Sequence, residues 1–327
     1  MAIRVREPGL LTTVQDTGRF GEYALGMPPS GAMDVFSYQV GNYLVGNADL
    51  GVAGLEITYF GPELEFTQAT IIALTGAEMP PKINGEEAPM WEALEVREGD
   101  VLTFDYLNSG ARTYLGVGGG IEVPLFMHSR STYTLIGLGG HEGRALQEGD
   151  ELKVGEAPPN AQGQVGKRVD EEHIPTYSKE TELRVIIGLA SYRITEESME
   201  EFLSTTWTVT PDADRVGYRY RGGELKFVER EQPAGAGAEQ ANVVDFGYPV
   251  GSIQVPGGVE PIVLLNDAVT GGGYATIGTV VSADRDRLAQ TKTNDKTRFR
   301  SVDLEEALKA RKQRQQQMEE IRQSLSN

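Results

Sequence analysis

The stretch that decides the fold is GLLTTVQDTGRFGEYALGMPPSGAMDVFSYQVGNYLVGN, residues 9–47. Its first half is rich in glycine, which permits left-handed backbone, and in proline, which fixes φ, so it predicts a series of tight turns. We predict a helix from about Met33, because the second half places apolar residues at helical spacing, at Val35, Tyr38, Val40, Tyr43 and Leu44. Ser30 or Asp34 is expected to cap this helix, since a short side-chain oxygen accepts a free backbone N–H at a helix start.

The PPSGAMD turn, residues 28–34, has two interpretations. It is either a structural connector between a strand and a core helix, or a functional loop that delivers Ser30, Asp34 and free backbone N–H groups to one place. In the second interpretation Asp34 is a candidate catalytic residue and Ser30 a candidate substrate-binding residue. The sequence alone leaves both open.

Composition limits the function classes. The chain has 327 residues, enough for two domains or one large one, and its 40 glycines and 16 prolines are typical of a turn-rich, β-rich protein. The formal net charge of −18 argues against nucleic acid or an anionic membrane surface as a partner. There is no cysteine, no signal-peptide core and no 18-residue apolar run, so we expect a soluble, cytoplasmic protein.

The domain organisation follows from changes in composition. Residues 155–181 are polar and rich in glycine and proline, and this predicts a linker between domains at 1–154 and 182–300. Asn84-Gly85 is the strongest hairpin signal in the first domain. Residues 301–327 predict a charged amphipathic helix capped by Asp303, whose sparse apolar positions suggest that it is dispensable for folding of the two domains.

A second candidate site lies in NDAVTGGGYATIG, residues 266–278. Asp267 follows a predicted strand and is a candidate base or amide-orienting group. The glycines allow close approach of a ligand, and successive N–H groups can form an anion nest. The candidate substrate-binding residues here are Thr270, Gly272, Gly273 and Tyr274. The alternative interpretation of this stretch is a wide hairpin loop.

Arginines supply a further candidate. Arg130 and Arg144 bracket a GLGG run, and a guanidinium there could hold a substrate carboxylate through two hydrogen bonds. The alternative is surface ion pairing with Glu142 or Glu148. The chain contains no GxxxxGK[ST] motif for ATP and no biotinyl-lysine site, and its three histidines lack metal-binding spacing, so no metal site is predicted.

Several blocks in family order resemble the allophanate hydrolase subunit 2 family, also called the biotin-dependent carboxyltransferase-like family. That family includes the C subunit of 5-oxoprolinase, the antagonist partner of a bacterial histidine-kinase inhibitor, and part of the carboxyltransferase region of urea carboxylase. The blocks are GLLTTVQDTGR (9–19), PPSGAMD (28–34), LVGN (44–47), LEITYFGPELEF (55–66), IIALTGAE (71–78), SRSTYTLIGLGGHEGRALQEGD (129–150), PDADRVGYR (211–219), GSIQVPGG (251–258) and PIVLLNDAVTGGGYATIGTVVSAD (261–284).

The resemblance implies a mainly β fold with a few helices, built from two cyclophilin-like β-barrel domains to which the C-terminal helix is added. It also implies ATP-dependent opening of 5-oxoproline to glutamate, at a site shared with proteins like the A and B subunits of 5-oxoprolinase, the A-like and B-like partners. ATP would bind at the level of the complex, and no biotin would be attached to this chain. In that setting Asp34 and Asp267 are anchors or bases and Arg130 is a carboxylate clamp. We expect the B-like partner to bind near the PPSGAMD turn.

The second loop departs from the family pattern. The family usually shows DRQTTGGYPK where this chain has DAVTGGGYAT, residues 267–276, so the Arg, Gln, second Thr, Pro and Lys of the pattern are replaced. Two other functions therefore remain open. One is a non-catalytic regulatory module that binds a B-like inhibitor of a histidine kinase, and the other is a carboxyltransferase-type protein that acts with a biotin carrier on another chain.

Overall fold

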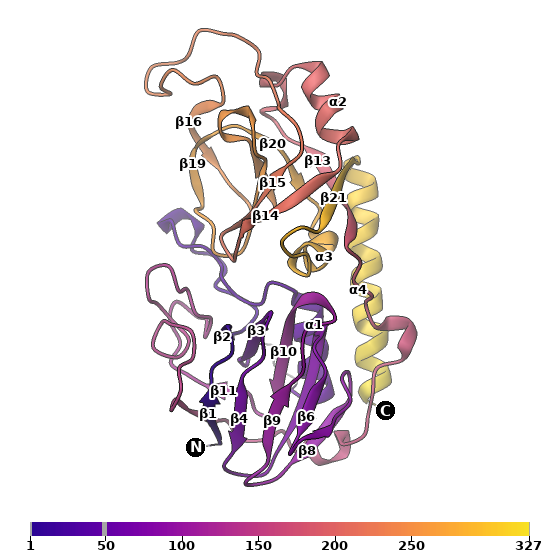
Figure 1. Ribbon diagram of the computed structural model, residues 1–327. Helices are drawn as coiled ribbons and strands as arrows, with labels where there is room; N and C mark the ends of the chain where they lie inside the picture. The colour runs from indigo at the N-terminus through magenta and orange to yellow at the C-terminus, as the bar shows by residue number, and fades with distance from the viewer. Residues whose placement is uncertain (1, 48–50, 327) are drawn as a thin grey trace. The chain divides into compact units, whose positions relative to one another are not determined.

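The computed structural model describes residues 2–47 and 51–326, and the chain divides into two compact units (Figure 1). Unit 1 comprises Met1–Arg19, Ser30–Tyr177 and Gln315–Asn327, and unit 2 comprises Phe20–Pro29 and Ser178–Arg314. The main division, between Tyr177 and Ser178, lies inside the predicted linker. Both units are dominated by β-strands, so the prediction of a mainly β chain that ends in a helix is confirmed.

Unit 1 contains two sheets and the helix predicted from the opening stretch. Its elements are β1 (Ile3–Glu7), β2 (Leu11–Gln15), α1 (Val35–Leu44), β3 (Gly54–Thr58), β4 (Glu63–Phe66), β5 (Thr70–Glu78), β6 (Pro81–Ile83), β7 (Glu86–Glu87), β8 (Ala93–Val96), β9 (Val101–Phe104), β10 (Ser109–Val117), β11 (Ile121–Glu122), β12 (Glu151–Val154), η2 (Ala161–Gln164) and η3 (Glu171–His173).

The two sheets of unit 1 share one apolar core. The seven-stranded sheet has the order β11-β12-β1-β4-β9-β6-β7, and the five-stranded sheet has the order β2-β3-β10-β5-β8. Side chains from both sheets pack together, among them Val5, Leu64, Leu55 and Leu115. The predicted hairpin at Asn84-Gly85 is confirmed, because β6 and β7 pair in antiparallel fashion around it and both turn residues have positive φ.

Unit 2 is built on a closed barrel with the strand order β13-β20-β17-β18-β15-β14-β21. Its elements are η1 (Tyr23–Leu25), β13 (Glu180–Ile187), η4 (Ser191–Arg193), α2 (Glu196–Ser204), β14 (Trp207–Ala213), β15 (Gly217–Arg221), β16 (Asn242–Gly247), β17 (Ser252–Gln254), η5 (Pro256–Gly258), β18 (Ile262–Leu264), β19 (Gly271–Tyr274), β20 (Thr276–Val280), η6 (Ser282–Asp284), α3 (Arg285–Ala289) and β21 (Lys296–Ser301). Strands β13 and β21 pair in parallel. In the part of the chain that the structure describes, unit 2 holds the closed barrel and unit 1 holds two sheets.

The predicted linker is folded onto unit 1 up to its boundary with unit 2. Ala161 and Val169 are buried in an apolar cluster with α1. Lys167 donates from Nζ to the carbonyl oxygen of Leu325, at 2.7 Å. Polar, glycine-rich composition therefore did not produce an extended connector here, because a few apolar side chains were enough to fix the segment.

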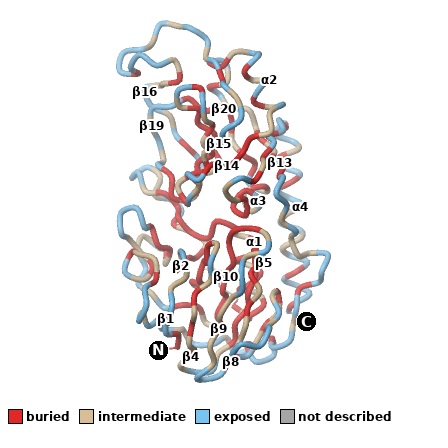
Figure 2. The backbone as a smooth tube through the Cα atoms, viewed as in Figure 1, coloured by how far each residue is buried: buried red, intermediate tan, exposed pale blue. Residues whose placement is uncertain are grey.

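The C-terminal helix α4 (Leu304–Ser326) begins after Asp303, whose Oδ1 accepts the N–H of Glu306 at 2.8 Å as predicted. Most of α4 is exposed (Figure 2), including Leu304 and Leu308. Ile321 and Leu325, however, are almost completely buried in the α1 cluster of unit 1. The last turns of this helix therefore fill part of a core of unit 1, and its dispensability for folding stays a prediction.

No helix in residues 2–47 and 51–326 is both long enough and apolar enough to cross a membrane.

Candidate functional site

The start of α1 is fixed by Asp34, one of the candidate catalytic residues. Its Oδ1 accepts the N–H of Ser37 at 3.0 Å and its Oδ2 accepts the hydroxyl of Ser37 at 2.6 Å. The predicted cap at Asp34 is thus confirmed. Because Asp34 is 1% exposed and both carboxylate oxygens are engaged, the geometry favours an anchoring role for it.

The turn before α1 adopts backbone that favours glycine. Ser30 has φ 51° and Gly31 has φ 81°, and a Cβ added at Gly31 would lie 2.7 Å from the backbone of Gly18. The turn at Gly31 therefore packs tightly against the turn at Gly18. Residues 28–34 are all buried. This burial does not support the expectation that a partner binds at this turn.

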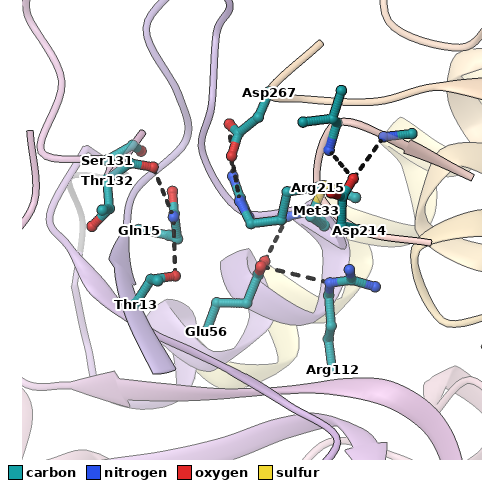
Figure 3. Close-up of polar contacts among 12 residues, drawn as sticks. Thr13, Gln15, Met33, Glu56, Arg112, Ser131, Thr132, Asp214, Arg215 and Asp267 are labelled. Carbon is teal, nitrogen blue, oxygen red and sulfur yellow. Dashed lines mark hydrogen bonds and ion pairs between the residues drawn. The ribbon is translucent and has the colours of Figure 1, made fainter. Parts of the chain in front are cut away.

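A buried charge network holds the same turn from below (Figure 3). Glu56 of β3 accepts, at Oε2, the N–H of Met33 and the hydroxyl of Tyr114, both at 2.8 Å. Its Oε1 lies 3.6 Å from Nε of Arg112, and both side chains are at most 2% exposed. Burial, followed by the nearby carboxylates of Glu56 and Asp34, raises the pKa of Tyr114 well above its usual value. The phenol therefore stays protonated and acts as a donor to Glu56.

Asp16 joins two parts of the chain that are far apart in sequence. Its carboxylate accepts the N–H of Gly18 and the hydroxyl of Ser129, both at 2.8 Å, and the N–H of Arg130 at 2.6 Å. A short hydrogen bond from the hydroxyl of Ser131 completes this set. The QDTGR and SRST segments are consequently held in one buried cluster.

Arg130, the predicted carboxylate clamp, is held in this cluster through its backbone N–H, which donates to Asp16. The guanidinium of Arg130 donates from Nη1 to the carbonyl oxygen of Gly51, at 3.2 Å. Arg144 instead pairs with Asp150 and Glu142, each at 2.7 Å, so the ion-pairing alternative is correct for Arg144. Arg144 donates hydrogen bonds that lower the pKa of Asp150 to about 2, while partial burial opposes this shift.

Gln15, at the end of β2, carries a buried polar atom. Its Nε2 donates to Thr13 Oγ1 and to the carbonyl oxygen of Thr132, both at 3.1 Å (Figure 3). Because a carbonyl oxygen can only accept, this pair of bonds fixes the orientation of the amide. Its Oε1 has no hydrogen-bond donor among the residues that the structure describes.

In unit 2 the candidate base Asp267 forms a buried ion pair with Arg215 (Figure 3). Arg215 donates from Nε to Oδ2 at 2.8 Å and from Nη2 to Oδ1 at 3.3 Å. The N–H of Asp267 also donates to the carbonyl oxygen of Arg215, at 2.9 Å. Both carboxylate oxygens are therefore engaged, and Asp267 is arranged as a positioning group more than as a free base.

The glycine run forms a strand, and this corrects the prediction of an anion nest. Strand β19 pairs with β16, with Phe246 opposite Gly272. Gly271, Gly272 and Gly273 are absent from the positive-φ positions of the described chain, whereas a nest needs left-handed residues in its path. The other strand of this ribbon, β16, comes from Asn242–Gly247.

Tyr248 ties this ribbon together. Its hydroxyl accepts the N–H of Tyr274 at 2.7 Å and donates to the carbonyl oxygen of Tyr274 at 2.9 Å. The carbonyl oxygen of Thr270 accepts the N–H of Tyr248 at 2.8 Å. A Cβ added at Gly272 would lie 3.0 Å from the Tyr248 ring. Glycine at this position is therefore explained by packing against an aromatic ring, and Tyr274 itself is 41% exposed.

The candidate site residues thus fall into separate groups. Unit 1 places Ser30 and Asp34 on one turn and Arg130 in the Asp16 cluster. Unit 2 pairs Asp267 with Arg215. Tyr248 forms hydrogen bonds with Thr270 and Tyr274 and lies against Gly272, and Gly273 belongs to the same strand, β19. Sequence reasoning missed Asp16, Glu56, Arg112, Arg215 and Tyr248. The available signal was a charged residue inside an apolar strand, as at Glu56 in GLEIT and Arg112 in SGARTYLGV.

No group of three or more histidine, aspartate or glutamate side chains in the described part of the chain is arranged to hold a metal ion.

Comparison with known proteins gives consistent results. The family model described as carboxyltransferase domain, subdomain A and B, matches residues 25–301. The C subunit of 5-oxoprolinase from Escherichia coli is 33% identical over 326 residues, which are 99% of each chain. Urea amidolyase from Saccharomyces cerevisiae is 34% identical over 307 residues, which are 91% of this chain and 16% of the yeast protein.

A solved structure agrees with these sequence relatives. The crystal structure of Kluyveromyces lactis urea carboxylase matches with a TM-score of 0.91 at 31% identity, over 98% of this chain and 29% of that one. The chain therefore spans only a small part of the urea-processing relatives that it matches.

Proposed function

The chain belongs to the family of the carboxyltransferase domain, subdomain A and B, and on that premise we propose that it serves as the C subunit of an ATP-dependent 5-oxoprolinase. The observation that carries this proposal is the alignment with the C subunit of the Escherichia coli 5-oxoprolinase, which includes 99% of both chains. A second protein with the same name, from Haemophilus influenzae, is 31% identical over 95% of this chain and 94% of its own length.

The proposed reaction explains why ATP is needed. The lactam of 5-oxoproline is a resonance-stabilised amide, so water attacks it slowly. Transfer of the terminal phosphoryl group of ATP to the lactam oxygen, with release of ADP, activates the ring carbon. Attack by one water then opens the C–N bond and leaves the γ-carboxyl group of glutamate as an acyl phosphate. A second water hydrolyses this acyl phosphate to glutamate and phosphate. We propose that this chain contributes binding groups to a site that the A-like and B-like partners complete.

Roles for individual residues follow from their contacts. Asp34 and Asp267 are proposed as anchors, because each carboxylate has both oxygens engaged by other groups. Arg130 is proposed to bind the substrate carboxylate, since a guanidinium has five donors and, among the residues that the structure describes, its side chain uses one of them, toward Gly51. In unit 2, Tyr274 is proposed as a ligand-binding residue at an exposed strand position, and Thr270, Gly272 and Gly273 belong to the same ribbon.

One assay tests the proposal directly. ATP hydrolysis is measured with and without 5-oxoproline for this chain alone, for the two partners without it, and for all three together. We expect 5-oxoproline-dependent hydrolysis only in the three-component mixture. Robust turnover by the single chain, or full turnover by the partners without it, would contradict the assignment. Binding of the B-like partner without any turnover would favour the regulatory function.

A carboxyltransferase function is the second candidate. It is favoured by the TM-score of 0.91 with Kluyveromyces lactis urea carboxylase. In this function biotin would be attached to a carrier on another chain. The discriminating measurement is decarboxylation of a carboxybiotin carrier in the presence of this chain and an amide acceptor such as urea. Acceptor-dependent loss of the carboxyl group would support this second function over the first.

A further inference from the structure

Unit 2 contains a fully buried arginine outside all of the sites described above. Arg193 ends the short helix η4 and is 1% exposed. Its Nη2 donates to Gln232 Oε1 at 3.3 Å. Its Nε is buried without a hydrogen-bond acceptor, and no carboxylate forms an ion pair with it in residues 2–47 and 51–326.

A second arginine converges on the same acceptor. Arg230 donates from Nη2 to Gln232 Oε1 at 3.4 Å. It is half-buried, and its Nε also lacks an acceptor within the described chain. Glu229 and Glu231 flank Arg230 and are exposed, yet neither forms an ion pair with either arginine in the described structure. Two guanidinium groups therefore share one neutral amide oxygen, although two carboxylates are next to Arg230 in the sequence.

The shared amide is held in place by the loop that carries it. Gln232 donates from Nε2 to the carbonyl oxygen of Glu239, at 2.7 Å. A carbonyl oxygen can only accept, so this bond turns Oε1 of Gln232 toward the two arginines. Gln240 donates from Nε2 to the carbonyl oxygen of Arg230, at 3.1 Å. These bonds brace the backbone at Arg230, and the two guanidinium groups are arranged in advance of any ligand.

The physical argument concerns the missing negative charge. Moving a cation out of water is costly unless an anion or several acceptors replace the lost hydration. Here one amide oxygen serves two cations at long hydrogen-bond distances. Guanidinium groups bind carboxylates and phosphates through paired N–H donors, so a compact oxyanion supplies both the charge and the acceptors that are lacking.

We propose that Arg193 and Arg230, braced by Gln232, form a binding site in unit 2 for a compact oxyanion, the carboxylate or phosphate group of a small molecule. The proposal does not rest on the proposed 5-oxoprolinase function, because it concerns binding by this chain and involves no bond breakage. The chain has a net charge of −18, which repels anions in general. Binding of an anion here therefore depends on the local positive charge of these two arginines.

The test uses the full chain and isothermal titration calorimetry. Inorganic phosphate is the first probe and glutamate the second, each in a buffer without other oxyanions, so the two arms distinguish the phosphate source from the carboxylate source. We expect saturable binding of at least one probe and a weakening of about tenfold or more in Arg230→Gln. The matched control is Arg298→Gln, since Arg298 is an exposed arginine of the same unit that donates to Thr206.

Two further variants keep the proposal falsifiable. Arg193→Lys retains the charge but removes the paired donors, so we expect weaker binding with the same thermal unfolding profile. If Arg193→Lys does not fold, Arg230→Gln alone decides, because Arg230 is only half-buried. Binding that is equal in wild type and Arg230→Gln, or the absence of saturable binding of both probes, overturns the proposal.

Discussion

Glu56 and Arg112 lie on the neighbouring strands β3 and β10 of unit 1, with Arg112 Nε 3.6 Å from Glu56 Oε1 and both side chains buried. Removal of one member takes the opposite charge away from the buried side chain of the other, so Glu56→Ala is expected to lower the free energy of unfolding by about 3–5 kcal/mol. Chemical denaturation measures this. Glu56→Gln keeps an acceptor for Met33 and Tyr114 and should cost less. The control Glu63→Gln, in an exposed pair with Arg6, should have little effect.

Asp34 tests whether the N-cap is only structural. Asp34→Ala removes the acceptor for Ser37 and should destabilise unit 1 by about 1 kcal/mol, as measured by thermal or chemical unfolding. Asp34→Asn preserves a capping oxygen and should restore most of that stability. If Asp34 is an anchor, the Asn variant also retains activity in the reconstituted complex. Loss of kcat in a fully stable Asp34→Asn protein would instead identify the carboxylate as a base.

Asp150 is expected to make stability depend on pH in the acid range. Its pKa in the folded chain is about 2, below the usual 3.8, mainly because Arg144 donates hydrogen bonds to it. A lowered folded-state pKa means that the stabilisation is complete above about pH 4 and is lost as the pH falls toward 2. The side chain is 11% exposed, so the contribution is about 2 kcal/mol.

The Asp150 measurement compares two variants across that pH range. Asp150→Asn should lower the free energy of unfolding at neutral pH and show a smaller further loss between about pH 4 and pH 2 than wild type. Asp105→Asn is the control, because Asp105 pairs with Lys82 at the surface. An unchanged slope in Asp150→Asn would argue against the ion pair with Arg144 as the cause.

The last turns of α4 are expected to stabilise unit 1. Ile321→Ala should lower the free energy of unfolding by about 3 kcal/mol, because the side chain is fully buried in the apolar cluster that also contains Trp91 and Phe36. Leu308→Ala on the same helix is the control, since Leu308 is 53% exposed. The chain has two tryptophans, so in a Trp207→Phe background the fluorescence of Trp91 reports unfolding of unit 1. Equal effects of the two alanine variants would contradict the burial of Ile321.

Tyr248 is expected to control the order of the β16–β19 ribbon. Tyr248→Phe removes the hydroxyl that forms hydrogen bonds with the N–H and the carbonyl oxygen of Tyr274. This loss should lower the free energy of unfolding by about 1 kcal/mol. The specific readout is faster amide hydrogen exchange at Tyr274, which donates its N–H to the Tyr248 hydroxyl. Tyr192→Phe serves as the control because Tyr192 is 70% exposed. Unchanged exchange in Tyr248→Phe would show that the ribbon is held by its strand pairing alone.

Local features were predictable from the sequence because their physics acts over a few residues. The cap at Asp34 acts three residues along the chain on Ser37, and the cap at Asp303 acts in the same way on Glu306. Asn84-Gly85 specifies its hairpin through the φ values that those two residues tolerate. The apolar spacing from Val35 to Leu44 likewise predicted the helix α1, in which Tyr38, Val40 and Leu44 are buried.

The rest was decided by tertiary structure, because the partners are distant in sequence. Asp16 and Ser129 are 113 residues apart, and Arg215 and Asp267 are 52 residues apart, so no local pattern pairs them. The glycines of β19 have no strand propensity of their own and become a strand because β16 and Tyr248 supply the hydrogen bonds. The sequence by itself determined the turns, caps and strand-rich class of this protein, whereas long-range contacts decided which charges are buried together and therefore which residues are free to bind a ligand.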